Sequence, residues 1–82
     1  MDTTTRRPRD QHIVYARQRA LLALLADPGP GGVLEALTSM LTDLRAHPET
    51  RDHPAIEDAT GRTLNGQLTD VAEVRAWIGG IR

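Results

Sequence analysis

The stretch ALLALLADPGPGG (residues 20–32) decides the fold, because seven residues without a polar side chain are followed by an aspartate, prolines and glycines. Alanine and leucine favour helices, and no breaker interrupts residues 11–26, so these residues predict a helix with Asp10 as its N-cap. Pro28 cannot continue the helical hydrogen-bond ladder and forces the preceding residue out of the α region. A long helix followed by a sharp connector is therefore expected.

A second helix, over residues 32–46, is predicted by the cleanest amphipathic pattern in the chain. Its apolar residues fall on one side, and a four-three-four heptad spacing relates Val33, Leu37, Met40 and Leu44. A short connector between two such helices is typical of an antiparallel helical hairpin.

A short helix over residues 54–60 is predicted next, with Pro54 in its first turn and Gly61 as its terminator. In the segment 63–68, the dipeptide Asn65-Gly66 predicts a turn. A minimal β-hairpin is the alternative, but each of its arms would be only about three residues long, and so short a hairpin is marginally stable.

A C-terminal helix is predicted over residues 70–78, where Asp70 and Glu73 have the spacing of a capping box. The predicted fold is therefore an all-α helical bundle. It forms one domain, residues 10–82, preceded by a flexible basic arm, residues 1–9.

The composition limits how so small a domain can be stabilised. The 82 residues contain no cysteine, which excludes disulfides and thiolate metal sites and suits a reducing cytoplasm. The chain has no apolar run long enough for a membrane span, so we expect a cytoplasmic protein without membrane contact. All ten basic residues are arginine, as expected of a GC-rich, bacterial genome.

The apolar surplus of the first helix predicts a partner. Its second half is apolar nearly all round, which is typical of a helix buried on more than one side. We expect a homodimer or a larger protein partner, with an interface formed by Leu21, Leu22, Leu25 and Trp77. The alternative is that the C-terminal helix covers the second side of the first helix within a monomer.

One polar cluster carries residue types suited to chemistry: His47, Glu49, Asp52 and His53. Imidazole and carboxylate groups bind divalent metals and act as general bases. These residues occupy a segment with two prolines, however, without the helical spacing usual for metal ligands. We interpret the cluster as a solvated loop and expect no catalytic residue, cofactor or metal.

The charge distribution supports a second hypothesis. Residues 1–26 carry a net charge of +3, residues 27–61 carry −5, and the remainder carries +1. Nucleic-acid contacts could come from Arg6, Arg7, Arg9, Arg17 and Arg19. The acidic side chains of the second helix disfavour a role as a recognition helix.

The sequence therefore predicts a small non-enzymatic module for protein interaction. It would self-associate or regulate a larger protein, as inhibitors, antitoxins and accessory proteins do. A small DNA-binding regulator that uses the arginine-rich arm is the alternative.

Overall fold

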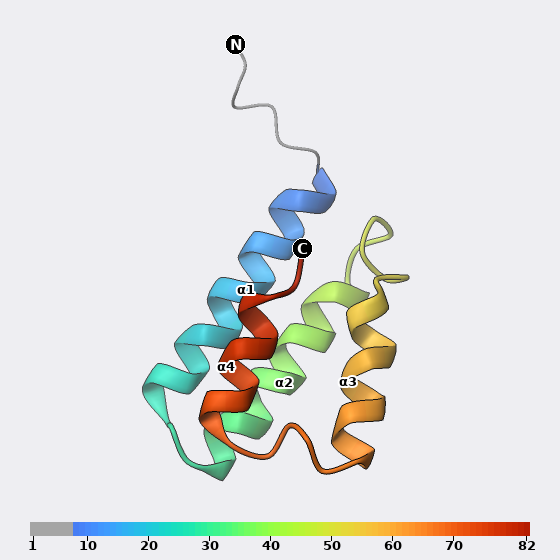
Figure 1. The fold of residues 1–82 in the computed structure, drawn as a ribbon. Helices are drawn as coiled ribbons and strands as arrows, with labels where there is room; N and C mark the ends of the chain where they lie inside the picture. The colour runs from blue at the N-terminus through green and yellow to red at the C-terminus, as the bar shows by residue number, and fades with distance from the viewer. Residues whose placement is uncertain (1–7) are drawn as a thin grey trace.

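The computed structural model describes residues 8–82, apart from the side chains of Pro8 and Leu64, and these residues form four helices and no strand. In chain order the helices are α1 (Pro8–Ala26), α2 (Pro30–Arg45), α3 (Pro54–Leu64) and α4 (Val71–Gly79). Figure 1 shows α1 and α2 as an antiparallel hairpin, with α4 lying against both and α3 beside α2. The prediction of an all-α bundle built on a hairpin is confirmed.

The core lies where α1, α2 and α4 meet. The seam predicted on α2 faces inward, since Val33, Leu37, Met40 and Leu44 are all buried. The remaining buried apolar side chains come from every helix, from the connection between α3 and α4 and from the segment after α4: Ile13, Ala16, Ala20, Leu24, Ala36, Ala55, Ala59, Leu68, Val74, Ile78 and Ile81. Val74 and Ile78 have no exposed surface, so α4 covers one flank of the hairpin.

Both long helices begin earlier than the sequence analysis predicted. The first starts at Pro8 instead of residue 11, so Asp10 lies inside the first turn and is not the cap. The second starts at Pro30 instead of residue 32 and ends at Arg45. Proline suits the first helical position because its missing N–H would have no intrahelical partner there. Of the predicted basic arm, residues 1–7 lie outside the described residues, and Pro8 and Arg9 belong to α1.

The connector between α1 and α2 is tight because Asp27 closes it. Its Oδ1 accepts a hydrogen bond of 2.9 Å from the N–H of Gly29, the N-cap of α2. A Cβ atom at Gly32 would lie only 1.5 Å from the carbonyl oxygen of Asp27. The chain therefore needs glycine at position 32 for close approach of two backbone segments.

The sequence analysis predicted that the third helix ends at Gly61, but the helix continues to Leu64. Its terminator is Gly66, which has a positive φ of 73°. The N–H of Gly66 bonds the carbonyl of Thr63 at 3.0 Å, and that of Gln67 bonds the carbonyl of Arg62 at 2.8 Å. This is a Schellman motif. The predicted turn is present, but the hairpin alternative is wrong because the residues before the turn are helical.

The last helix is capped as its sequence predicts. Asp70 Oδ1 accepts a bond of 2.9 Å from the N–H of Glu73. The helix runs from Val71 to Gly79, one residue beyond the predicted end. Ile81 follows it and is 5% exposed, so the chain after α4 still contributes to the core.

Thr50 anchors the connection between α2 and α3. Among the described residues, Thr50 is a polar residue with no exposed surface. Its Oγ1 donates a 2.6 Å hydrogen bond to the carbonyl of Leu44. Carbonyls in the last turn of a helix have no intrahelical donor. Thr50 therefore satisfies one of them and holds the connection against the end of α2.

Within residues 8–82, no helix combines the length and the apolar character that a membrane crossing requires.

Candidate functional site

The outer face of α1, defined here as Gln11, Tyr15, Gln18, Leu22 and Leu25, carries three of the exposed large apolar side chains of the described chain. These residues recur at spacings of four, three, four and three, so they form one stripe along the helix, and all are exposed. The three large apolar side chains are 56%, 62% and 73% exposed at Tyr15, Leu22 and Leu25, respectively. Apolar residues at heptad spacing are typical of a helix face that packs against another helix.

The stripe lies opposite the side of α1 that enters the core. That inner side carries Ile13, Ala16, Ala20 and Leu24, all buried. Leu21, from the predicted interface, packs partly against the core, whereas Leu22 and Leu25 stay in solvent. The fold thus covers the inner side and one flank of α1 and leaves the outer face uncovered within a single copy of the described chain.

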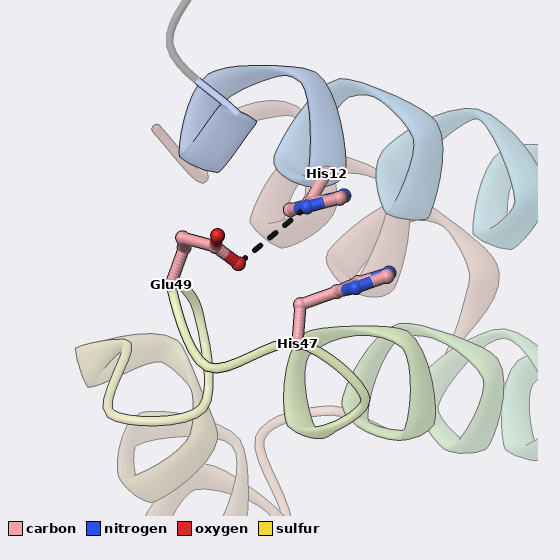
Figure 2. Close-up of side chains that lie close together, drawn as sticks. All are labelled: His12, His47 and Glu49. Carbon is pink, nitrogen blue, oxygen red and sulfur yellow. Dashed lines mark ion pairs between the residues drawn. The ribbon is translucent and has the colours of Figure 1, made fainter.

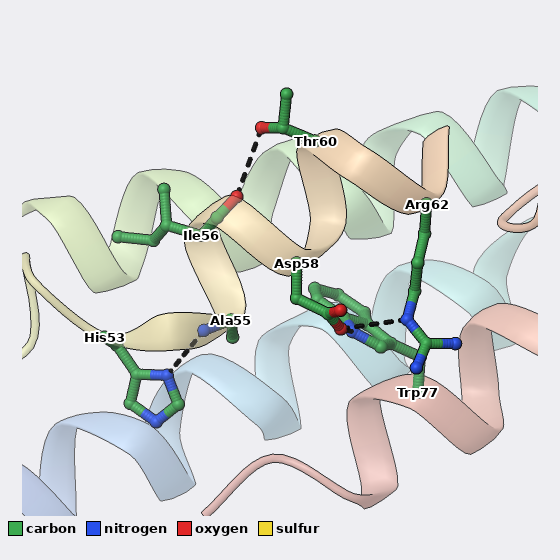
Figure 3. A network of polar contacts seen from close by, with 7 residues as sticks. All are labelled: His53, Ala55, Ile56, Asp58, Thr60, Arg62 and Trp77. Carbon is green, nitrogen blue, oxygen red and sulfur yellow. Dashed lines mark hydrogen bonds and ion pairs between the residues drawn. The ribbon is translucent and has the colours of Figure 1, made fainter. Parts of the chain in front are cut away.

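Trp77, the fourth predicted interface residue, takes part in an intramolecular contact. Its indole Nε1–H donates a 2.8 Å hydrogen bond to Asp58 Oδ2, which also accepts a 2.9 Å bond from Arg62 Nε. Figure 3 shows the three side chains meeting between α3 and α4. The Trp77 bond is the main reason that the pKa of Asp58 lies below its ordinary value, with Arg62 adding to the effect and partial desolvation opposing it.

This contact borders a hollow of about 770 Å³ between α3 and α4. Its charged lining has both signs, from Asp58, Arg62, Glu73 and Arg82. Neither an anion nor a cation is therefore favoured by the net charge of the hollow, and Asp58 and Arg62 already neutralise each other.

The predicted polar cluster is divided by the structure. His47 and Glu49 lie close to each other, and they are joined by His12 of α1, which the predicted cluster did not include. Figure 2 shows the two imidazole rings stacked, with the Glu49 carboxylate beside them. The ring centroids are 3.6 Å apart with an interplanar angle of 5°, and His12 Nε2 lies 3.6 Å from Glu49 Oε1.

His53 has a separate role at the start of α3. Its Nδ1 accepts a 3.0 Å hydrogen bond from the N–H of Ala55, which makes it the N-cap of the helix. Since Nδ1 accepts, Nε2 carries the proton and donates to the main-chain oxygen of Arg82, 2.7 Å away. Both ring nitrogens are thus engaged. Asp52 is exposed in the same connection and is not part of the group formed by His12, His47 and Glu49.

Three of the arginines proposed to contact nucleic acid lie within the described residues, and each makes a contact within the fold. Arg19 pairs with Asp43 at 3.1 Å and lies 5.6 Å from the ring centroid of Tyr15. Arg17 donates to the carbonyl of Gly79 at 3.4 Å, and Arg9 lies 3.6 Å from Asp10. Arg6 and Arg7 lie outside the described residues.

The chain matches no protein-family model, curated protein or solved structure in the three comparisons made with known proteins. Functional inference therefore rests on the residues themselves.

Two features of these surfaces were missed by the sequence analysis. The first is the heptad spacing of the outer face of α1, which the printed sequence contains but which the many apolar residues nearby obscure. The second is the contact of His12 with His47, which are 35 positions apart. No local pattern indicates that contact, because it depends on how the start of α1 meets the end of α2.

Proposed function

We propose that this protein is a small non-enzymatic interaction module of the cytoplasm that self-associates through the outer face of α1. The observation that carries the proposal is the exposure of Tyr15, Leu22 and Leu25 on one heptad-spaced stripe. Exposed apolar patches mark interfaces more often than chance, and two-fold homodimers are the commonest assembly of identical chains.

A second copy suits this face because the stripe is self-complementary in an antiparallel pair. With the two-fold axis level with residue 20, Tyr15 of one copy meets Leu25 of the other, and Gln18 meets Leu22. Tyr15 and Leu25 then pack against each other, and Leu22 packs against the side chain of Gln18. The amide of Gln18 is the polar position of the seam, and a polar residue in such a seam selects one register over others at a cost in affinity.

The experiment is a measurement of molar mass against concentration by sedimentation equilibrium, with the full chain and Leu22→Glu. The full chain should show a reversible monomer–dimer equilibrium. Two copies of Leu22 become buried per dimer, at about 1.5–3 kcal/mol each, so Leu22→Glu should weaken the dimer at least about 100-fold.

Leu34→Glu is the matched control, because Leu34 is 66% exposed but lies on α2, outside the stripe. It should leave the dimer unchanged. A full chain that remains monomeric at all concentrations, or equal losses from both substitutions, would refute self-association through this face.

The same samples test the DNA-binding alternative. A DNA fragment of arbitrary sequence is titrated at about 50 mM salt, where phosphate contacts are strongest. A shift that disappears when residues 1–9 are removed would favour that alternative. The ion pair of Arg19 with Asp43 reduces the support for this alternative, since that guanidinium group is already paired with a carboxylate.

A further inference from the structure

We propose that His12, His47 and Glu49 form a binding site for a transition-metal ion of the Zn²⁺ type, which links the start of α1 to the connection between α2 and α3. The three side chains offer two imidazole nitrogens and a carboxylate oxygen. This donor set is one that zinc uses in proteins, with a water molecule completing four-coordination. The proposal replaces the expectation, drawn from sequence, that the polar cluster is only a solvated loop.

The distances between donor atoms already approach those of a bound ion. All three ligand atoms lie within 4.8 Å of one another, and His12 Nε2 is 3.6 Å from Glu49 Oε1. Two ligands about 2.0–2.1 Å from a tetrahedral ion are about 3.3 Å apart. Only small displacements therefore separate the observed arrangement from a coordinating one.

The main adjustment concerns the two rings. Stacked rings with an interplanar angle of 5° hold their in-plane lone pairs in two nearly parallel planes, whereas a shared ion requires the lone pairs to converge. Rotation about χ2 achieves this convergence, and that torsion has a broad energy minimum in histidine. Both histidines are partly exposed, so the rings have room to turn.

The backbone around two of the ligands is well held. The carbonyl of His47 accepts hydrogen bonds from the N–H groups of Thr50 and Arg51, at 3.1 and 3.0 Å. Buried Thr50 fastens the same turn to Leu44. These bonds fix the positions of His47 and Glu49 relative to α2, and a preorganised turn lowers the entropic cost of gathering the ligands.

The site also meets a need of this fold. Small domains often add a disulfide, a metal or a partner to the stability of their core, and this chain has no cysteine. An ion held by His12 and His47 would link residues 35 positions apart. All three ligands come from one copy, so the site does not depend on the proposed dimer.

The test is calorimetric titration of the full chain, free of any polyhistidine tag and of chelating buffers, with ZnCl₂ and separately with MgCl₂. We expect one Zn²⁺ per chain and no heat from Mg²⁺, which prefers oxygen ligands. At a free Zn²⁺ concentration about 100-fold above Kd, the Tm should rise by about 10 °C or more.

Single variants locate the ligands. Affinity should fall at least tenfold in His12→Gln, His47→Gln and Glu49→Gln. It should be unchanged in Asp52→Asn, which removes an exposed carboxylate from the same connection. In NMR spectra, Zn²⁺ should shift the imidazole signals of His12 and His47 and leave those of His53 in place.

Leu22→Glu should bind Zn²⁺ as the parent chain does, which separates this proposal from self-association. Absence of Zn²⁺ binding, unchanged affinity in the His12 and His47 variants, or equal loss in Asp52→Asn would each overturn the site.

Discussion

At the scale of single residues, Thr50 shows how one side chain secures a connection. It has no exposed surface, and its hydroxyl donates to the carbonyl of Leu44 at 2.6 Å. Thr50→Val keeps the shape but leaves that buried carbonyl without its donor. We expect a loss of about 1–3 kcal/mol in the free energy of unfolding, measured by urea denaturation. Thr50→Ser retains the hydroxyl and should recover the part of the loss that the hydrogen bond accounts for.

Asp58 offers a second test at this scale. Its pKa is lowered chiefly by the hydrogen bond from Trp77, so Trp77→Phe should raise it toward the ordinary value. Arg62→Gln should raise it less. A lowered pKa in the folded state stabilises the fold above the ordinary carboxyl pKa, and that contribution is lost as the pH falls below about 4. Titration of the carboxyl carbon signal by NMR measures the shift, and an unchanged curve in Trp77→Phe would contradict this account.

At the scale of elements, two glycines in helices have opposite environments. A Cβ at Gly61 would meet no atom within 4 Å, whereas one at Gly32 would collide with the backbone of Asp27. Gly61→Ala should therefore stabilise the protein by about 0.5–1 kcal/mol. Gly32→Ala should destabilise it, because the α1–α2 connector must move. Thermal unfolding of both variants checks the prediction, and a shift of the same sign in both would contradict it.

The same glycines show what the sequence could and could not predict. Glycine is a common helix terminator, and both Gly61 and Gly66 were available for that role. The structure uses Gly66, and α3 passes through Gly61 with an ion pair of 2.9 Å between Asp58 and Arg62 spanning the position. Local helix propensity does not determine whether α3 ends at Gly61 or at Gly66. The end of the helix depends on which carbonyl groups accept hydrogen bonds from the residues that follow it.

Local sequence patterns, in contrast, were sufficient to predict the helical hairpin from its apolar periodicity and the α4 cap from the spacing of Asp70 and Glu73. The inward seam of α2 and the cap at Asp70 depend only on neighbours within a few positions. The grouping of His12 with His47 and the bond between Trp77 and Asp58 join separate elements. Such pairs require the three-dimensional packing, and they are the pairs that carry the candidate chemistry.

At the scale of the whole molecule, stability should be unevenly distributed. The hairpin of α1 and α2 is packed along its length, while α3 contributes two buried residues to the core among its described side chains, Ala55 and Ala59. Figure 1 shows α3 at the side of the bundle, beside α2. Its described side-chain hydrogen bond to α4 runs from Trp77 to Asp58. An element with little buried apolar surface is expected to open locally before the rest.

Native-state hydrogen exchange should therefore show the earliest loss of protection in α3. We expect the amides of residues 58–64 to exchange at least about tenfold faster than those of residues 37–44 in α2, since opening α3 exposes little apolar surface. Trp77→Phe removes the tie between α3 and α4, so it should accelerate exchange in α3 further and leave α2 nearly unchanged. Arg75→Gln is the control, because Arg75 is an exposed residue of α4. Equal protection in α2 and α3, or equal acceleration of both helices by Trp77→Phe, would show that the four helices open as one unit.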